Sequence, residues 1–173
     1  MRKVLYILTR LNDEDVDWLS SVGRRQKLEV GSVLIRQGQA IEALIFVLEG
    51  QVSVTVDGVG EVARLGSGEI LGEMSLVDES LPSATVTVVQ PTQVLAVEKQ
   101  HLVARLESHA EFAARFYRAI AMFLSIRMRN TVQRLGYGNT PAATEEELDL
   151  ALLDAVHVGG ARFDRMIKEL LGA

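Results

Sequence analysis

The pattern of hydrophobic and polar positions divides the chain into a β-rich middle and two helical flanks. Near the start, Val16 and Leu19 follow Asn12, a residue type that often caps the beginning of a helix. Three acidic residues come directly after this cap, where the helix dipole favours negative charge. We therefore expect helices within residues 2–22, with Gly23 as the stop signal.

From Lys27 to about Val97 the hydrophobic period becomes two, which is typical of strands with one buried and one wet face. Turn signals, which contain glycine except at Gln90-Pro91, separate short runs rich in β-branched residues. These runs predict strands at 32–35, 44–48, 52–56, 61–65, 69–71, 84–89 and 92–97. Many short strands at close spacing predict an α+β, mainly β fold, built on an antiparallel jelly roll or double-stranded β-helix.

Helical periodicity returns after Lys99, with a short helix expected over 100–107 and a long one over 110–135. The long helix has an apolar stripe that is broader than one contact needs. Its members are Phe112, Phe116, Ile120, Phe123, Leu124, Met128 and Leu135. We expect one side to pack on the β-roll and another to form a homodimer; a helix that packs on one side only is the alternative.

A Gly- and Pro-containing stretch over 136–141 then interrupts the helical pattern, and two short tail helices are expected over 144–156 and 161–171. The tail helices are expected to dock on the chain's own core or on a dimer partner, or else to recruit another protein. The predicted segments are therefore N-terminal helices over 1–23, the β-roll over 24–100, a hinge and long helix over 101–138, and a helical tail over 139–173.

Composition and charge exclude several classes of function. The net charge of −5 disfavours a general nucleic-acid surface, and the chain has no cysteine. Its histidines, His101, His109 and His157, have no metal-ligand spacing, and none lies in the β-rich part, where a cupin would need them. No nucleophile–base motif is present. We expect no enzyme activity, no metal and no cofactor.

The apolar runs are much shorter than the roughly 20 residues that cross a bilayer. The amino terminus has neither the length nor the cleavage site of a signal peptide. The sequence therefore predicts a cytoplasmic protein that does not insert into a membrane.

One segment has residues suited to hold a phosphate. Gly72 lets the backbone approach a ligand closely, and one helical turn over 73–78 would offer free N–H groups to an anion. Glu73 would repel a phosphate, so it is better suited to accept a hydrogen bond from a ribose hydroxyl. Ser83 and Thr85 add hydroxyl donors where the chain returns.

Two stretches carry a family resemblance. Residues 35–54, with their glycine spacing, look like the β2–β4 signature of cyclic-nucleotide-binding domains, and 72–76 with 83–86 resemble the phosphate-binding cassette of that family. The resemblance covers roughly residues 11–135. It implies a sensor for cAMP or cGMP in which Glu73 holds the ribose 2′-hydroxyl and backbone amides hold the cyclic phosphate. The ligand-binding residues it implies are Gly72, Glu73, Met74, Ser75, Leu76, Pro82, Ser83, Ala84 and Thr85, with Arg127, Asn130 and Thr131 facing the base.

Pro82 departs from the family pattern, because it stands where the phosphate-binding arginine is usual. A hydrogen bond to a charged group contributes about 1.5–3 kcal/mol, so its loss would weaken binding by about one to two decades. Arg36, Arg64 and Arg127 are the candidate substitutes. We also expect no DNA binding, because the tail is too short for the winged helix-turn-helix of catabolite activators and has an acidic start.

Two hypotheses of function follow. The first is a homodimeric, non-catalytic sensor that binds a cyclic nucleotide and signals through the long helix to a protein partner. The second is a degenerate β-roll without ligand that serves as an interaction or assembly module. It resembles stand-alone bacterial proteins of this kind, some of them associated with transport systems.

Overall fold

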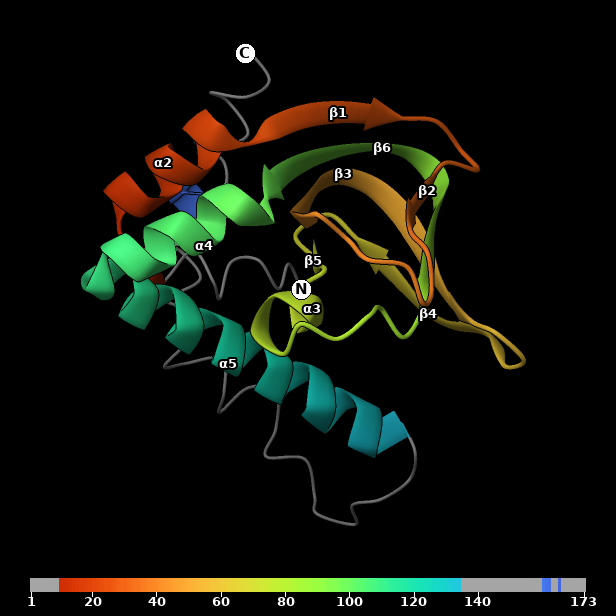
Figure 1. Ribbon diagram of the computed structural model, residues 1–173. Helices are drawn as coiled ribbons and strands as arrows, with labels where there is room; N and C mark the ends of the chain where they lie inside the picture. Colours follow the sequence, from red (N-terminus) through yellow and green to blue (C-terminus); the bar gives the residue numbers. More distant parts are fainter. Residues whose placement is uncertain (1–9, 135–159, 163–164, 166–173) are drawn as a thin grey trace.

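The computed structural model describes residues 10–134, 160–162 and 165 (Figure 1). The helix expected at the extreme amino terminus and most of the tail lie outside these residues. The elements are α2 (Asp13–Val22), β1 (Arg24–Leu28), β2 (Val33–Ile35), β3 (Ala43–Val56), β4 (Gly60–Gly66), β5 (Ile70–Leu71), α3 (Met74–Val77), β6 (Thr85–Glu98), α4 (Lys99–Ser108) and α5 (Ala110–Arg134).

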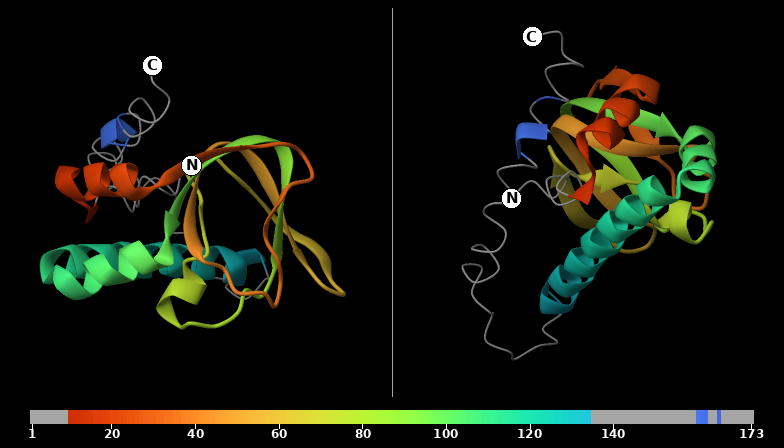
Figure 2. Two further views of the ribbon diagram at one scale, coloured as in Figure 1. Left: turned by 45° about the horizontal axis from the view of Figure 1, so that its top comes forward. Right: turned by 90° about the vertical axis from the view of Figure 1, so that its left-hand side faces the viewer.

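The six strands of the described residues form one antiparallel sheet around a long central pair, β3 and β6. Strands β1 and β2 pair with β6 on one side, while β4 and β5 pair with β3 on the other. The sheet curls into a roll, and α2, α4 and α5 gather at one end of it (Figures 1 and 2). The predicted mainly β roll with flanking helices is thereby confirmed.

Strands β3 and β6 are each continuous where the sequence predicts two strands. The predicted turn at 49–50 is a bend inside β3, at which the register against β6 shifts several times. Gly50 has φ +94°, and a Cβ there would lie 2.4 Å from the carbonyl oxygen of Pro91. The glycine therefore marks a close approach of two bent strands and not a chain reversal. Strand β1, which is polar and partly exposed, was missed because it lacks an apolar alternation.

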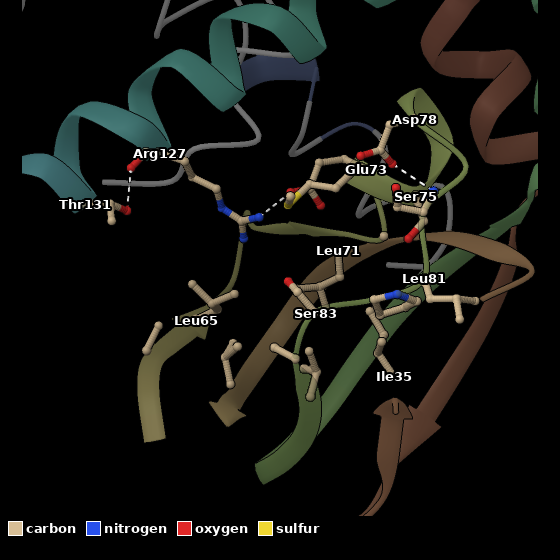
Figure 3. A pocket seen from close by; sticks show the side chains of 18 of the residues that line it. Ile35, Leu65, Leu71, Glu73, Ser75, Asp78, Leu81, Ser83, Arg127 and Thr131 are labelled. Carbon is tan, nitrogen blue, oxygen red and sulfur yellow. Dashed lines mark hydrogen bonds and ion pairs between the residues drawn. The ribbon is translucent and has the colours of Figure 1, made fainter. Parts of the chain in front are cut away.

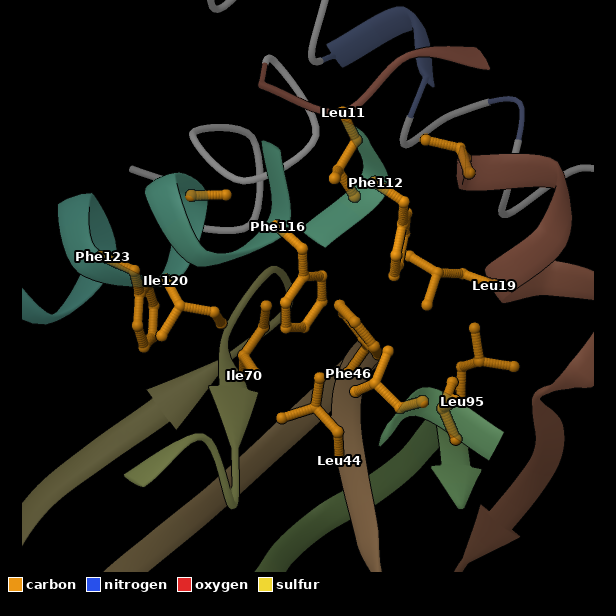
Figure 4. Packing of buried hydrophobic residues seen from close by; sticks show 14 of the residues in the cluster. Leu11, Leu19, Leu44, Phe46, Ile70, Leu95, Phe112, Phe116, Ile120 and Phe123 are labelled. Atoms are coloured by element: carbon orange, nitrogen blue, oxygen red, sulfur yellow. The ribbon is translucent and has the colours of Figure 1, made fainter. Parts of the chain in front are cut away.

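The apolar run in the first half of β3 arises because this segment is buried on both faces. Ile45 and Val47 point into the roll, where they join a core cluster with residues of β2, β4 and β6. Leu44, Phe46 and Leu48 point the other way and join the core between the roll and the helices (Figure 4). One strand segment thus forms the wall between two cores, and its sequence shows no polar alternation for that reason.

The two sides of α5 differ from the simple stripe expected from the sequence. Phe112, Phe116, Ile120 and Phe123 are buried against the roll and α2, with Phe112 and Phe116 in aromatic contact at 5.5 Å between ring centroids (Figure 4). Met128 is 66% exposed, and Tyr117 and Val132 are also exposed. The aromatic part of the stripe is therefore core, and a separate apolar row faces outwards. Leu135 lies outside the described residues.

Helix α2 is fixed to α5 by a partly buried ion pair. Asn12 and Asp15 form a capping box at the start of α2, as the sequence indicates for Asn12. The Asp15 carboxylate also accepts hydrogen bonds from Arg115 of α5, at 2.7 and 3.0 Å. Gly23 ends α2, although not in the left-handed conformation expected of a helix stop. Its φ is −76°, and a Cβ would lie 2.4 Å from Leu95 Cδ1, so close packing requires glycine there.

Candidate functional site

A cavity of about 380 Å³ opens between the interior of the roll, the turn around α3 and the far part of α5 (Figure 3). This volume lies within the range of small-molecule sites in proteins. Its lining residues are Ile35, Val54, Ala63, Arg64, Leu65, Leu71, Gly72, Glu73, Met74, Ser75, Asp78, Ser80, Leu81, Pro82, Ser83, Ala84, Val86, Arg127 and Thr131.

The turn between β5 and α3, residues 72–76, forms one wall of the cavity and is named the cassette turn. Gly72 has φ +85°, and a Cβ at this position would lie 2.9 Å from the carbonyl oxygen of Ala43. Glycine is therefore required both by conformation and by space. The following helix, α3, is a single turn, and Lys99 Nζ donates to the carbonyl oxygen of Ser75 at 3.0 Å. The turn is thus bonded to the first residue of α4.

The returning segment around Pro82 forms a second wall. Its backbone is fixed by the loop after β2, because the Gly38 amide donates to the Pro82 carbonyl oxygen at 2.8 Å. Three residues further on, Thr85 Oγ1 accepts from the Gln37 amide at 3.0 Å. Ser83 and Ala84, between these anchors, face the cavity.

An ion pair between Glu73 and Arg127 joins the turn to α5 across the cavity (Figure 3). The side chain of Glu73 is 3% exposed, and Arg127 Nη1 donates to its Oε1. Arg127 Nη2 also donates to the Ile70 carbonyl oxygen at 3.4 Å, and Glu69 Oε2 is 3.8 Å away. The guanidinium lies 4.7 Å from the ring centroid of Phe123. Burial raises the pKa of Glu73 above its usual range, although Arg127 opposes this shift.

Replacement of Glu73 by glutamine is expected to stabilise the unliganded protein at neutral pH. A carboxyl group whose pKa is raised by folding binds protons more tightly in the native state, so wild-type stability falls as pH rises from about 4 through the raised pKa. Glutamine does not titrate and can still accept from Arg127. We expect a higher Tm than that of the wild type at pH 7.5, and the difference should shrink as pH falls towards 4.

Thermal unfolding of both proteins between pH 4 and 8 measures this gain. Asp57→Asn, an exposed acidic side chain on the β3–β4 hairpin, is the control and should follow the wild type. A Tm for E73Q below that of the wild type at pH 7.5 would contradict the expectation.

The structure brings most of the predicted site residues to the cavity. Gly72, Glu73, Met74, Ser75, Pro82, Ser83, Ala84, Arg127 and Thr131 all line it. Leu76 does not, because it packs against the core between the roll and the helices. Thr85 does not either, since its hydroxyl oxygen accepts from Gln37. Of the candidate substitutes for the missing arginine, Arg64 and Arg127 line the cavity and Arg36 does not.

The apolar floor of the cavity was not predicted as part of the site. It is formed by the inward side chains of β2, β3, β4, β5 and β6: Ile35, Val54, Ala63, Leu65, Leu71 and Val86. The signal for them was the alternation of the strands, which marks inward positions but does not tell which of them border a cavity. Asp78, Ser80 and Leu81, in the loop after α3, were also missed.

Two further observations concern metal ligands and membrane spans. Among the described residues, no group of three or more His, Cys, Asp or Glu side chains is arranged to hold a metal ion. Within the same part of the chain, no helix combines the length and apolarity that a membrane span requires.

The cavity and roll can now be compared with known proteins. Residues 25–109 match the model of the family described as the cyclic nucleotide-binding domain, in agreement with the resemblance seen in the sequence. The Cyclic AMP receptor protein of Thermus thermophilus is 35% identical over 98 residues, which are 54% of this chain and 45% of that protein. This chain thus spans less than half the length of the curated relatives it matches first.

Solved structures give the same picture of the fold. The Catabolite Activator Protein of Thermus thermophilus has a TM-score of 0.60 at 26% identity, covering 94% of this chain and 84% of that chain. A cyclic nucleotide-binding domain from Methylobacillus flagellatus has a TM-score of 0.71 at 22% identity, with 81% and 85% of the two chains covered. At that identity the second likeness is one of fold alone.

Proposed function

Because residues 25–109 belong to the cyclic nucleotide-binding domain family, we propose that the protein is a non-catalytic sensor that binds cAMP or cGMP in the cavity described above. The observation that carries the proposal is the ion pair between Glu73, on the cassette turn, and Arg127, on α5. A ligand seated beside it touches both the roll and the long helix. Cavity occupation is therefore coupled to the position of α5.

The ligand would use three kinds of contact. Glu73 can accept from a ribose hydroxyl, because a carboxylate has about four lone-pair sites, of which Arg127 and the Glu73 backbone amide occupy two. Ser75, Ser83 and Ala84 line the cavity, and their backbone amides would be the donors to a cyclic phosphate. Thr131 donates its hydroxyl hydrogen to the Arg127 carbonyl oxygen at 3.0 Å, so its oxygen is left to accept from a base.

The signal would leave through α5, which has a second apolar side. Tyr117, Met128 and Val132 are exposed on it, and Leu124 is half-buried. Tyr117, Met128 and Val132 turn away from the core, and they fit the seam of a homodimer better than the phenylalanines do, whereas Leu124 packs against the core. A ligand shifts α5 only by its difference in affinity for the two positions of the helix. The receiver is proposed to be a protein, in keeping with the net charge of −5.

One observation favours the second hypothesis, a roll that has lost its ligand and acts as an interaction module. Pro82 offers no cation, and the guanidinium of Arg127 is already bonded to Glu73 and near Glu69. An unliganded cavity can therefore satisfy its own charges. Binding measurements separate the two hypotheses.

Isothermal titration calorimetry with cAMP, cGMP and cyclic dinucleotides is the test. The sensor hypothesis expects saturable heat with at least one of them, and Glu73→Ala should abolish it because the ribose loses its acceptor. Absence of heat with all of them at millimolar ligand would reject the sensor and leave the interaction module.

Pro82→Arg is expected to strengthen cyclic-nucleotide binding by about tenfold or more. A forked arginine–phosphate contact is among the stronger single interactions, and Pro82 borders the cavity at the returning segment. Calorimetry of the variant against wild type measures the gain. Val59→Arg, at an exposed position of the β3–β4 hairpin that does not line the cavity, is the control for added charge. Unchanged affinity in P82R would mean that the phosphate lies elsewhere.

A further inference from the structure

We propose that Arg127, on α5, is the residue that holds the phosphate of the ligand, in place of the arginine that the cassette lacks. The inference rests on the proposed function. It moves the principal charge contact of the site from the roll to the long helix.

The first argument is the inventory of cations around the cavity. Of the lining residues, only Arg64 and Arg127 carry a positive side chain. Arg64 lies on β4, where its side chain is 58% exposed and its Nε donates to Glu61 Oε1 at 2.8 Å. Arg127 is 26% exposed, and its guanidinium projects into the cavity (Figure 3). Arg127 is therefore the less solvated of the two cations, and it is the one that is better placed to bind an anion inside the cavity.

The second argument is the number of donors that Arg127 has left. A guanidinium carries five N–H donors. Glu73 Oε1 and the Ile70 carbonyl oxygen each accept one of them. The others are left to donate to a phosphate without breaking the pair with Glu73. One guanidinium can then bridge the carboxylate that binds the ribose and the phosphate that is fused to the same ribose.

The third argument is that Arg127 is already oriented. Its guanidinium lies 4.7 Å from the ring centroid of Phe123, a fully buried side chain of the same helix. The contact with this ring and the bond to Glu73 restrict the side chain from two sides. Little conformational entropy would be lost when a phosphate arrives. Helix α5 begins beside the end of α4, away from the roll, and runs past α3 (Figure 1). Arg127 lies in its later part, so its guanidinium is close to the cassette turn.

The test compares cAMP with 2′-deoxy-cAMP, which keeps the phosphate and lacks the hydroxyl that Glu73 would bind. If Arg127 holds the phosphate, R127Q weakens both ligands by the same factor, about tenfold or more. If Arg127 acts only by positioning Glu73 for the ribose, the loss is present with cAMP and absent with 2′-deoxy-cAMP. The second result would overturn the proposal, as would unchanged affinity for both.

A double-mutant cycle with Pro82 gives an independent readout. The arginine introduced by P82R would serve the same phosphate, so R127Q should cost less than threefold in the P82R background while costing tenfold or more in the wild-type background. Equal losses in both backgrounds would overturn the proposal. R129Q is the matched control, since Arg129 lies one half-turn away on α5, is exposed and bonds to Ser125 Oγ; it should change affinity less than twofold.

Failure of the proposed function is visible separately, because the wild-type protein would then give no heat with either nucleotide.

If R127Q does not fold, R127K is used. It keeps the charge beside Glu73 but has no forked donors, and it should weaken both ligands equally, by threefold or more. An effect of R127K confined to cAMP, or none at all, would again overturn the proposal.

Discussion

Phe116→Ala is expected to lower the free energy of unfolding by about 3–5 kcal/mol, since removal of a fully buried phenylalanine loses its transfer energy and leaves a cavity. Phe116 packs between Phe112 and the strand side chains that point to the helices (Figure 4). Small domains are stable by about 5–15 kcal/mol, so the variant should lose a large part of its stability. Urea denaturation followed by circular dichroism measures the change.

Met128→Asp is the matched control on the same helix. Met128 is 66% exposed, so we expect a change within about 0.5 kcal/mol in a monomer. The proposed dimer seam predicts in addition that this variant is a soluble monomer in light scattering. A wild-type protein that is itself monomeric would contradict the dimer. A Phe116→Ala variant as stable as wild type would contradict the packing of α5 on the roll.

Asp15→Ala is the second change expected to have a large effect, a loss of about 3 kcal/mol at pH 7. Breaking a buried ion pair on one side typically costs about 3–5 kcal/mol. Asp15 is 1% exposed, but its partner Arg115 is 31% exposed and can be solvated when left alone, which favours the lower end. The capping box with Asn12 is lost as well.

The loss should depend on pH in a defined direction. Burial alone would raise the pKa of Asp15, but the hydrogen bonds from Arg115 and the Asn12 amide outweigh it and lower the pKa below the usual range. The stabilisation is therefore fully present above the unfolded pKa of about 3.9 and disappears as pH falls through the lowered native value. Denaturation at pH 7 and pH 2 measures it, with Glu107→Ala, exposed on α4, as control. A loss of equal size at both pH values would contradict this account.

The strand alternation was enough to predict the roll, because a strand with one wet face shows its geometry in the sequence. It failed where both faces are buried or where the chain bends. The segment Leu44–Leu48 was assigned correctly as a strand, but its continuation through Gly50 was not, since a glycine at a bulge and a glycine at a turn look alike in sequence. A close contact with Pro91, far along the chain, distinguishes them.

The candidate site was predictable in its local part and not in its long-range part. Gly72 could be singled out because a tight turn favours glycine. Glu73 and Ser83 could be singled out because their polar side chains lie in or near that turn in the sequence. The pair of Glu73 with Arg127 joins positions 54 residues apart, and only the fold determines their distance. The same holds for α5, where Phe116 and Met128 are both apolar in sequence and only packing decides which one is buried.

The bond from Lys99 to Ser75 gives the cassette turn two attachments to the helical layer. One is at the first residue of α4, through the Lys99 ammonium group, and the other is near the end of α5, through Arg127. Densely packed protein interiors have low compressibility, so they transmit strain. Both attachments lie at the open end of the α4–α5 hairpin, away from the connection between the two helices at His109, so a movement of the turn would pull on both helices at the same end (Figure 1). We therefore expect a displacement of the turn to tilt α4 and α5 together about their connection, and not to move one helix alone.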